Sequence, residues 1–197
     1  MPLDTAAVLA LAATCAPNVA PTTLLAIARV ESALNPLAIG VNGAGPKPRP
    51  ARDRAEAIRT AQALLAQRVD LDLGLAQINT RNLDRLGLTV PEAFEPCANL
   101  RAAADVLEAG YRGTSADTHP QARLRTALSV YNTGHPIRGF RNGYVAKVTA
   151  AAKIQDLAGS QASPAAIPPP APRRRVFGPT TAGGGPFVLS FQSGDRP

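Results

Sequence analysis

The density of proline and glycine changes abruptly near Gly159. From Ala158 onward, 14 of 40 residues are Pro or Gly, including the runs 168–170 and 183–185. Such a segment cannot bury enough side-chain surface to offset the conformational entropy that ordering would cost. We therefore predict one globular domain in residues 1–157 and a disordered or polyproline-like tail in residues 158–197.

Helix signals recur through the first 157 residues. Pro21 suits the first position of a helix, Asp53 with Glu56 resembles a capping box, and Asn99 suits an N-cap. Aromatic residues make up only 4% of the chain and Trp is absent, which favours a core of closely packed helices rich in Ala and Leu. The expected helices span 6–13, 21–34, 53–68, 99–111, 120–132 and 143–157.

Two stretches of the domain do not have a helical pattern. Residues 38–50 carry several Gly and Pro residues and are predicted to form a loop. Residues 70–79 alternate apolar and polar side chains, which indicates extended structure. The sequence therefore predicts an all-α fold with at most a short extended segment near residues 70–79.

Glu31 occupies an unusual place in the predicted helix 21–34. With successive residues about 100° apart, Leu24, Ile27 and Leu34 form an apolar stripe, and Glu31 falls inside it. A carboxylate in such a stripe requires a reason, since Glu is rarely buried without a partner. Two interpretations remain open: a buried ion pair with an arginine, or an acid whose pKa burial raises so that it donates a proton near neutral pH.

Charge constrains the partners of the chain only partly. The net charge is +7, with 17 Lys/Arg against 13 Asp/Glu in residues 1–157 and 4 against 1 in the tail. This balance suits an acidic cell-wall polymer, nucleic acid or anionic lipid. No basic run has interleaved aromatic residues, so we do not expect nucleic-acid binding. His119 and His135 are expected at the surface, and neither a metal site nor a cofactor is predicted.

Cys15 and Cys97 are the two cysteines of the chain, and their spacing matches no zinc or redox motif. They are either small buried apolar residues or, outside the cytoplasm, a disulfide pair. The apolar run 6–13 is too short to span a bilayer and lacks the basic residues that precede the core of a signal peptide. We expect no integral membrane segment and see no signal peptide.

Four short motifs, taken together and in this order, carry a family resemblance. They read ESALNPLAIG at 31–40, GLAQIN at 74–79, ALSVYNTG at 127–134 and GYV at 143–145. Over about residues 10–150 the chain thus resembles the soluble lytic transglycosylases and the goose-type lysozymes. With CAP at 15–17 and PCANL at 96–100, it is similar to the specialised transglycosylase subunit of type IV secretion systems.

The resemblance implies a lysozyme-like fold, a Cys15–Cys97 disulfide and a periplasmic or other envelope location. It implies that Glu31 is the one catalytic acid and base, cleaving the β-1,4 bond between N-acetylmuramic acid and N-acetylglucosamine in peptidoglycan. The product would carry a 1,6-anhydro sugar, formed without water. The cleavage would open the cell wall locally for assembly of a type IV secretion system, whose other subunits are the expected protein partners.

Some positions depart from the family pattern. Asn79 stands where goose-type lysozymes often have an Asp, and an amide cannot act as a base, which favours transglycosylation over hydrolysis. Ala76 replaces a Met found in many transglycosylases. A two-carboxylate mechanism would need a second acid, and Asp70 and Asp72 are the nearest, but both are predicted to be solvated residues on a strand face.

Polar residues of the motifs are expected to bind the glycan. The amides suit N-acetyl groups, Tyr131 could bond the Glu31 carboxyl or stack on a sugar, and a purely structural role remains open for each. The alternative functions are a muramidase that hydrolyses the same bond and a non-catalytic peptidoglycan-binding assembly module. The predicted substrate-binding residues are Ser32, Gln77, Asn79, Tyr131, Asn132 and Tyr144.

Overall fold

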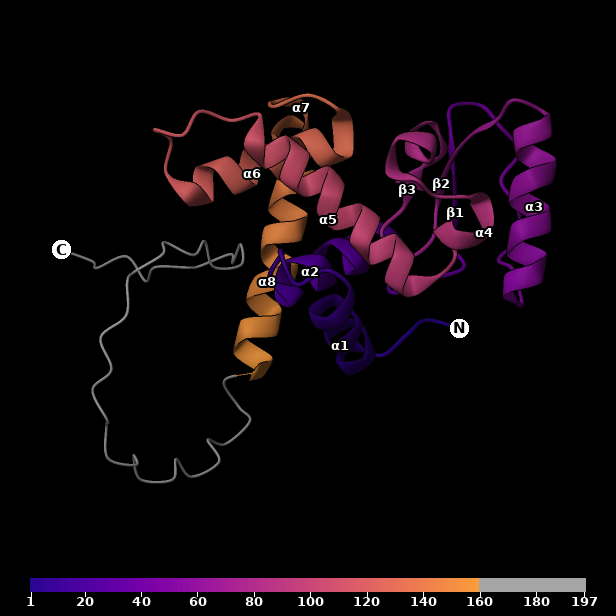
Figure 1. Ribbon diagram of the computed structural model, residues 1–197, viewed down its shortest axis with the longest axis horizontal. Coiled ribbons are helices and arrows are strands. Elements are labelled where there is room, and N and C mark those ends of the chain that lie inside the picture. The colour runs from indigo at the N-terminus through magenta and orange to yellow at the C-terminus, as the bar shows by residue number, and fades with distance from the viewer. Residues whose placement is uncertain (160–197) are drawn as a thin grey trace, which may run out of the picture.

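A computed structural model describes residues 1–159, with side chains described as far as Lys153. The described part is mostly helical, as predicted, and contains one small sheet (Figure 1). The predicted tail lies outside the described residues except for its first two, which belong to the last helix. The helices are α1 (Thr5–Cys15), α2 (Pro21–Ser32), α3 (Arg54–Ala66), α4 (Val90–Ala93), α5 (Pro96–Arg112), α6 (Pro120–Thr133), α7 (Arg138–Arg141) and α8 (Tyr144–Gly159), with 3-10 turns η1 (Thr80–Asn82) and η2 (Asp84–Leu86).

Several helix starts lie where local sequence signals put them. Pro21 and Pro120 occupy the first turns of α2 and α6, where their missing N–H groups need no partner. Asp53 caps α3 by accepting a hydrogen bond from the Glu56 amide at 2.8 Å. Helix α2 ends two residues earlier than predicted, because Ala33 adopts the left-handed conformation with φ of 52°.

The prediction that Asn99 caps a helix is wrong. Helix α5 begins three residues earlier, at Pro96, and Asn99 is fully buried within its first turns. A capping residue would satisfy the free amides at its own helix start. The Asn99 side chain instead bonds backbone groups of other segments, among them the carbonyl of Leu73.

The predicted loop 38–50 is wrong in its first part. Strand β1 (Ile39–Asn42) lies there and pairs antiparallel with β2 (Asp70–Leu73), which pairs in turn with β3 (Ile78–Asn79). Gly40 lies opposite Asp72, and a Cβ added at Gly40 would fall 2.5 Å from the Gln77 side-chain oxygen. A glycine that looks like a loop signal in sequence thus allows close approach within the sheet.

A single hydrophobic core joins the helices. Helix α2 packs against α1 and α8, and α5 contacts α1 and α6 on one side and the region of the sheet on the other. In Figure 1, α5 crosses the middle of the molecule, with α3, α4 and the strands on one side and the remaining helices on the other. The buried run Ala102–Ala104 lets neighbouring backbones approach α5 closely. The sequence motifs at 31–40, 74–79, 127–134 and 143–145 lie on α2, the sheet region, α6 and the start of α8.

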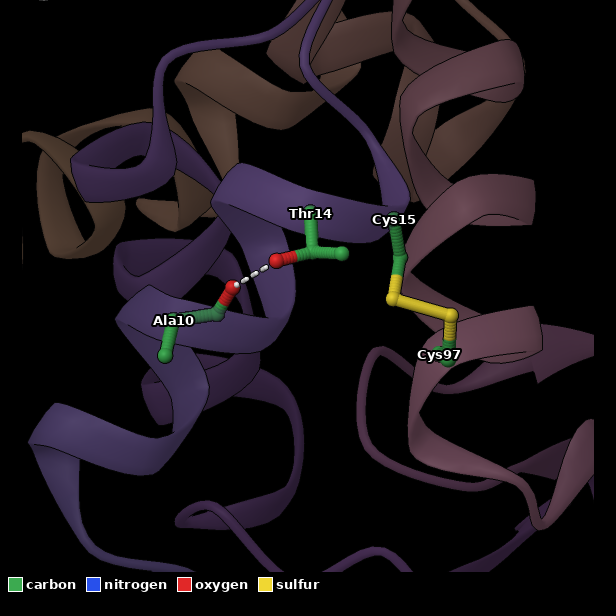
Figure 2. The surroundings of a disulfide bond; sticks show 4 residues. All are labelled: Ala10, Thr14, Cys15 and Cys97. Carbon is green, nitrogen blue, oxygen red and sulfur yellow. Dashed lines mark hydrogen bonds between the residues drawn. A yellow bond between two sulfur atoms is a disulfide. The ribbon is translucent and has the colours of Figure 1, made fainter.

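The predicted disulfide between Cys15 and Cys97 is confirmed. It joins the last residue of α1 to the first turn of α5, with the two Cα atoms 5.4 Å apart (Figure 2). Next to it, the Thr14 hydroxyl donates to the Ala10 carbonyl within the last turns of α1. Because 82 residues separate the cysteines, the crosslink stabilises the fold by about 4.5 kcal/mol in the chain-entropy model. Within residues 1–159, no helix has the length and apolarity needed to cross a membrane.

Candidate active site

Glu31 lies in the last turn of α2, with its side chain half-buried. Its Oε1 atom accepts a hydrogen bond of 2.6 Å from the hydroxyl of Tyr144, the first residue of α8. The two residues are 113 positions apart, so the packing of α2 on α8 brings them together. The hydrogen bond leaves the second oxygen, Oε2, as the one that can carry a proton toward a ligand.

Burial raises the pKa of Glu31 from 4.5 to about 7. The hydrogen bond from Tyr144 opposes this rise, and the negative charge of Asp72 adds to it. Among the described residues, the salt bridges do not include Glu31, so its partner is a tyrosine and not an arginine. The second interpretation of the buried carboxyl, an acid that holds its proton near neutral pH, is the one that fits the structure.

The turn Gly74–Gln77 lies beside Glu31 and is fixed from several sides. Its first and last residues have positive φ angles of 78° and 50°. The buried Asn99 side chain accepts from the Ala76 amide at 2.7 Å and donates to the carbonyls of Leu73 and Ala93. Asn99, which lies in helix α5, therefore holds the turn in place through these hydrogen bonds.

The same turn accepts hydrogen bonds from two helices. The Ser32 hydroxyl at the end of α2 donates to the Leu75 carbonyl at 2.6 Å. The Tyr131 hydroxyl on α6 donates to the Ala76 carbonyl at 2.7 Å. Tyr144, and not Tyr131, therefore supplies the hydrogen bond to Glu31. These contacts fix the position of the acid relative to the turn and to α6.

A cleft of about 460 Å³ opens over Glu31 between α2, α6 and the sheet. Of the seven predicted site residues, five line it and two lie outside its lining, Ser32 and Tyr144. The lining residues are Glu31, Asn42, Asp72, Gln77, Ile78, Asn79, Arg81, Asn82, Val106, Tyr131, Asn132, Thr133 and Gly134.

Several amides in the cleft already have partners in the protein. The Gln77 amide nitrogen donates to the carbonyls of Ala38 and Gly74. The Asn132 side-chain oxygen accepts from Asn142 at 2.8 Å. These bonds orient the side chains and leave the Gln77 oxygen and the Asn132 amide nitrogen as the groups that could meet an N-acetyl group.

The prediction that Asp72 is a solvated strand-face residue is wrong. Its carboxylate lines the cleft and accepts hydrogen bonds from Asn79 at 2.8 Å and Asn42 at 3.0 Å. Burial raises the pKa of Asp72, and the two amides oppose that rise. Asp70, in contrast, pairs with Arg81 at 3.1 Å. Only the pairing of β1 with β2 brings Asn42 beside Asp72, which explains why the sequence alone did not reveal this cluster.

Comparison with known proteins identifies the family. Residues 9–153 match the family model of the transglycosylase SLT domain, so the chain belongs to this family. The match confirms the resemblance to the soluble lytic transglycosylases and the lysozyme-like fold that it implies.

Similar proteins carry the name virB1. Protein virB1 of Rhizobium radiobacter is 46% identical over 152 residues, which cover 77% of this chain and 63% of the relative. Protein virB1 of Agrobacterium fabrum is 46% identical over 139 residues, covering 71% and 56%. The type IV secretion system protein virB1 of Brucella suis is 43% identical over 153 residues, covering 74% and 64%. The chain thus spans about three fifths of the length of these relatives, and no solved structure matches it significantly.

Proposed function

We propose that the chain is a peptidoglycan lytic transglycosylase with Glu31 as its one catalytic acid and base. It cleaves the β-1,4 bond between N-acetylmuramic acid and N-acetylglucosamine and leaves a 1,6-anhydro muramoyl end. The observation that carries the proposal is a carboxyl group that opens into a cleft and has a pKa of about 7. Such a group can donate a proton near neutral pH and then accept one.

The reaction needs one carboxyl group acting twice. First, the Glu31 proton passes to the glycosidic oxygen, which leaves C1 with the bonding electron pair. The muramoyl 6-hydroxyl oxygen then attacks C1, and its proton returns to the Glu31 carboxylate. Because Tyr144 holds Oε1, both transfers use Oε2. No water enters, and the acid ends the cycle protonated as it began.

Hydrolysis of the same bond is the second candidate function. An inverting hydrolase places a second carboxylate where it can activate water, and Asp72 provides a second carboxylate in the cleft. Transglycosylation fits better because one of the two amides that hold the Asp72 carboxylate replaces an acid. Asn79, in the position where an acid would be expected in goose-type lysozymes, is one of these amides and cannot act as a base.

We further propose that the enzyme works in the periplasm and opens the cell wall locally for a type IV secretion system. The Brucella suis relative is named as a type IV secretion system protein. The Cys15–Cys97 disulfide fits an oxidising compartment, and the net charge of +7 fits an acidic wall polymer. The other subunits of the secretion system are the proposed protein partners.

Replacement of Glu31 tests this function. Glu31→Gln removes the transferable proton and keeps the side-chain shape, so release of muropeptides from purified sacculi should fall by at least about 10²-fold. Binding to sacculi, measured by co-sedimentation, should be unchanged. The matched control is Glu95→Gln, which removes one negative charge from an exposed side chain elsewhere.

Two outcomes would contradict the proposal. A Glu31→Gln variant that releases muropeptides as fast as the natural sequence would exclude Glu31 as the acid. Natural protein that binds sacculi but releases no muropeptides would instead indicate the non-catalytic assembly module.

A further inference from the structure

The cleft holds three acidic or basic side chains, and their surroundings differ. Glu31 approaches from α2, Asp72 from β2 and Arg81 from η1. The Arg81 guanidinium pairs with Asp70 at 3.1 Å, so an acid outside the cleft lining partly offsets its charge. Two other titratable groups lie near Glu31: Tyr131, and Tyr144 bound to its Oε1.

Neutral groups hold the Asp72 carboxylate. Asn79 donates to Oδ1 at 2.8 Å and Asn42 donates to Oδ2 at 3.0 Å. Asn79 is itself fixed, since its side-chain oxygen accepts from the Arg81 amide and its nitrogen also donates to Asp70. The salt bridges of the described residues include Asp70 but not Asp72. Asp72 therefore has a held orientation and a negative charge that no paired cation offsets.

This placement matches what cleavage of a glycoside needs. When the glycosidic oxygen leaves with its electron pair and the Glu31 proton, one positive charge develops over C1 and the ring oxygen of the sugar. A fixed, partly buried negative charge lowers the energy of that state more than the energy of the neutral ground state. The charge acts at a distance and forms no bond.

We propose that Asp72 is the charge-stabilising residue of the cleft, held by Asn42 and Asn79, and that it acts neither as a nucleophile nor as a base. The inference rests on the proposed glycan cleavage. Both oxygens accept amide hydrogen bonds that hold the carboxylate in place, so we assign it an electrostatic role and no proton transfer. Its charge also discourages ionisation of Glu31, which keeps the acid loaded with its proton.

The test compares Asp72→Asn with Asp70→Asn. Both substitutions remove one negative charge from the same face of β2, but only Asp72 lines the cleft. Turnover is measured on soluble glycan strands across a range of pH, and the pKa of Glu31 is followed in each variant by carbon NMR of the side-chain carboxyls. The NMR titration requires no turnover, so it separates failure of this inference from failure of the proposed function.

Asp72→Asn should lower kcat by roughly 10-fold to 100-fold with little change in KM, and should lower the Glu31 pKa by about half a unit or more. Asp70→Asn should change each quantity much less. Because an Asn at position 72 would face two amide donors, Asp72→Ser provides a second uncharged side chain, checked for folding by its thermal transition. It should behave as Asp72→Asn does.

Two results would overturn the inference. One is equal kcat and an equal Glu31 pKa in the Asp72 and Asp70 variants. The other is an Asp72 variant that still releases anhydro ends but loses a fraction of hydrolysed product made by the natural sequence, which would identify Asp72 as a base for water.

Discussion

At the scale of single residues, the buried carboxyl group of Glu31 makes the stability of the fold depend on pH. Its pKa in the folded protein, about 7, lies above the usual 4.5 because burial penalises the ionised form. Between these two pH values the folded state binds more protons than the unfolded state, so stability falls as pH rises. This loss of stability is complete above the pKa of Glu31 in the folded protein and absent below its pKa in the unfolded chain.

Glu31→Gln should therefore stabilise the protein at alkaline pH. The free energy of unfolding should rise by roughly 1 to 3 kcal/mol at about pH 8 and change little at about pH 4. Urea denaturation of both proteins at the two pH values measures this difference. A substitution effect of the same size at both pH values would show that the Glu31 pKa is not raised in the fold.

The two carboxyl groups of the cleft differ in how far sequence could reveal them. Glu31 stands out because its position in an apolar helical stripe is a local property of residues 21–34. Asp72 reads locally as a polar residue of an alternating strand. The role proposed for Asp72 depends on Asn42, which the pairing of β1 with β2 brings beside it. Sequence periodicity carries no information on that pairing.

At the scale of elements, the turn Gly74–Gln77 depends on helix α5. A Cβ at Gly74 would collide with the Ala93 carbonyl and the Asn99 amide, so the turn requires glycine there as well as its positive φ. Two carbonyl groups of this turn accept hydrogen bonds from the hydroxyl groups of Ser32 and Tyr131. Asn99 is thus a positioning residue for the site although it does not line the cleft.

Asn99→Ala should destabilise the protein by about 2 to 4 kcal/mol, because it leaves the Ala76 amide and two carbonyls without their buried partner. Chemical denaturation measures the change. The exposed Asn18, which bonds Glu108 at 2.6 Å, gives a control, and Asn18→Ala should cost no more than about 1 kcal/mol. Equal losses in the two variants would contradict the role assigned to Asn99.

The element boundaries show which signals were local. Pro21, Asp53 and Pro120 mark helix starts through backbone and capping chemistry within one turn, and all three starts are confirmed. The capping box predicted with Glu56 forms only in part, since the Glu56 carboxylate accepts from the Arg52 amide and not from the Asp53 amide. The Asn99 side chain could cap a helix in the same way, but it donates instead to the Leu73 carbonyl, 26 residues away in the sequence. Whether such a polar residue caps its own helix or bonds a distant segment therefore depends on the tertiary fold.

At the scale of the whole molecule, the motifs, the core and the disulfide all lie within residues 1–159. The tail prediction lies outside the described residues and stays a prediction. A chain that ends at Leu157 should digest sacculi more slowly at low substrate concentration and reach comparable turnover at saturation. The tail carries a net charge of +3, which includes Arg173–Arg175, and this charge should attract the enzyme to an acidic wall. Salt screens such an attraction.

A full-length variant with these three arginines changed to glutamine serves as the control and should behave as the shortened chain does. Added salt should remove the difference from the natural sequence in both. A shortened chain that remains folded by circular dichroism but loses turnover at saturating sacculi would show that the tail completes the active site.

The central claim is that Glu31 drives cleavage without water, and the products of one digestion test it most directly. Purified sacculi are digested in isotope-labelled water and the released muropeptides are weighed by mass spectrometry. The claim predicts 1,6-anhydro ends, each one water lighter than a reducing end and free of the label, and their loss in Glu31→Gln. Reducing ends that carry the label would contradict it and would make the protein a muramidase.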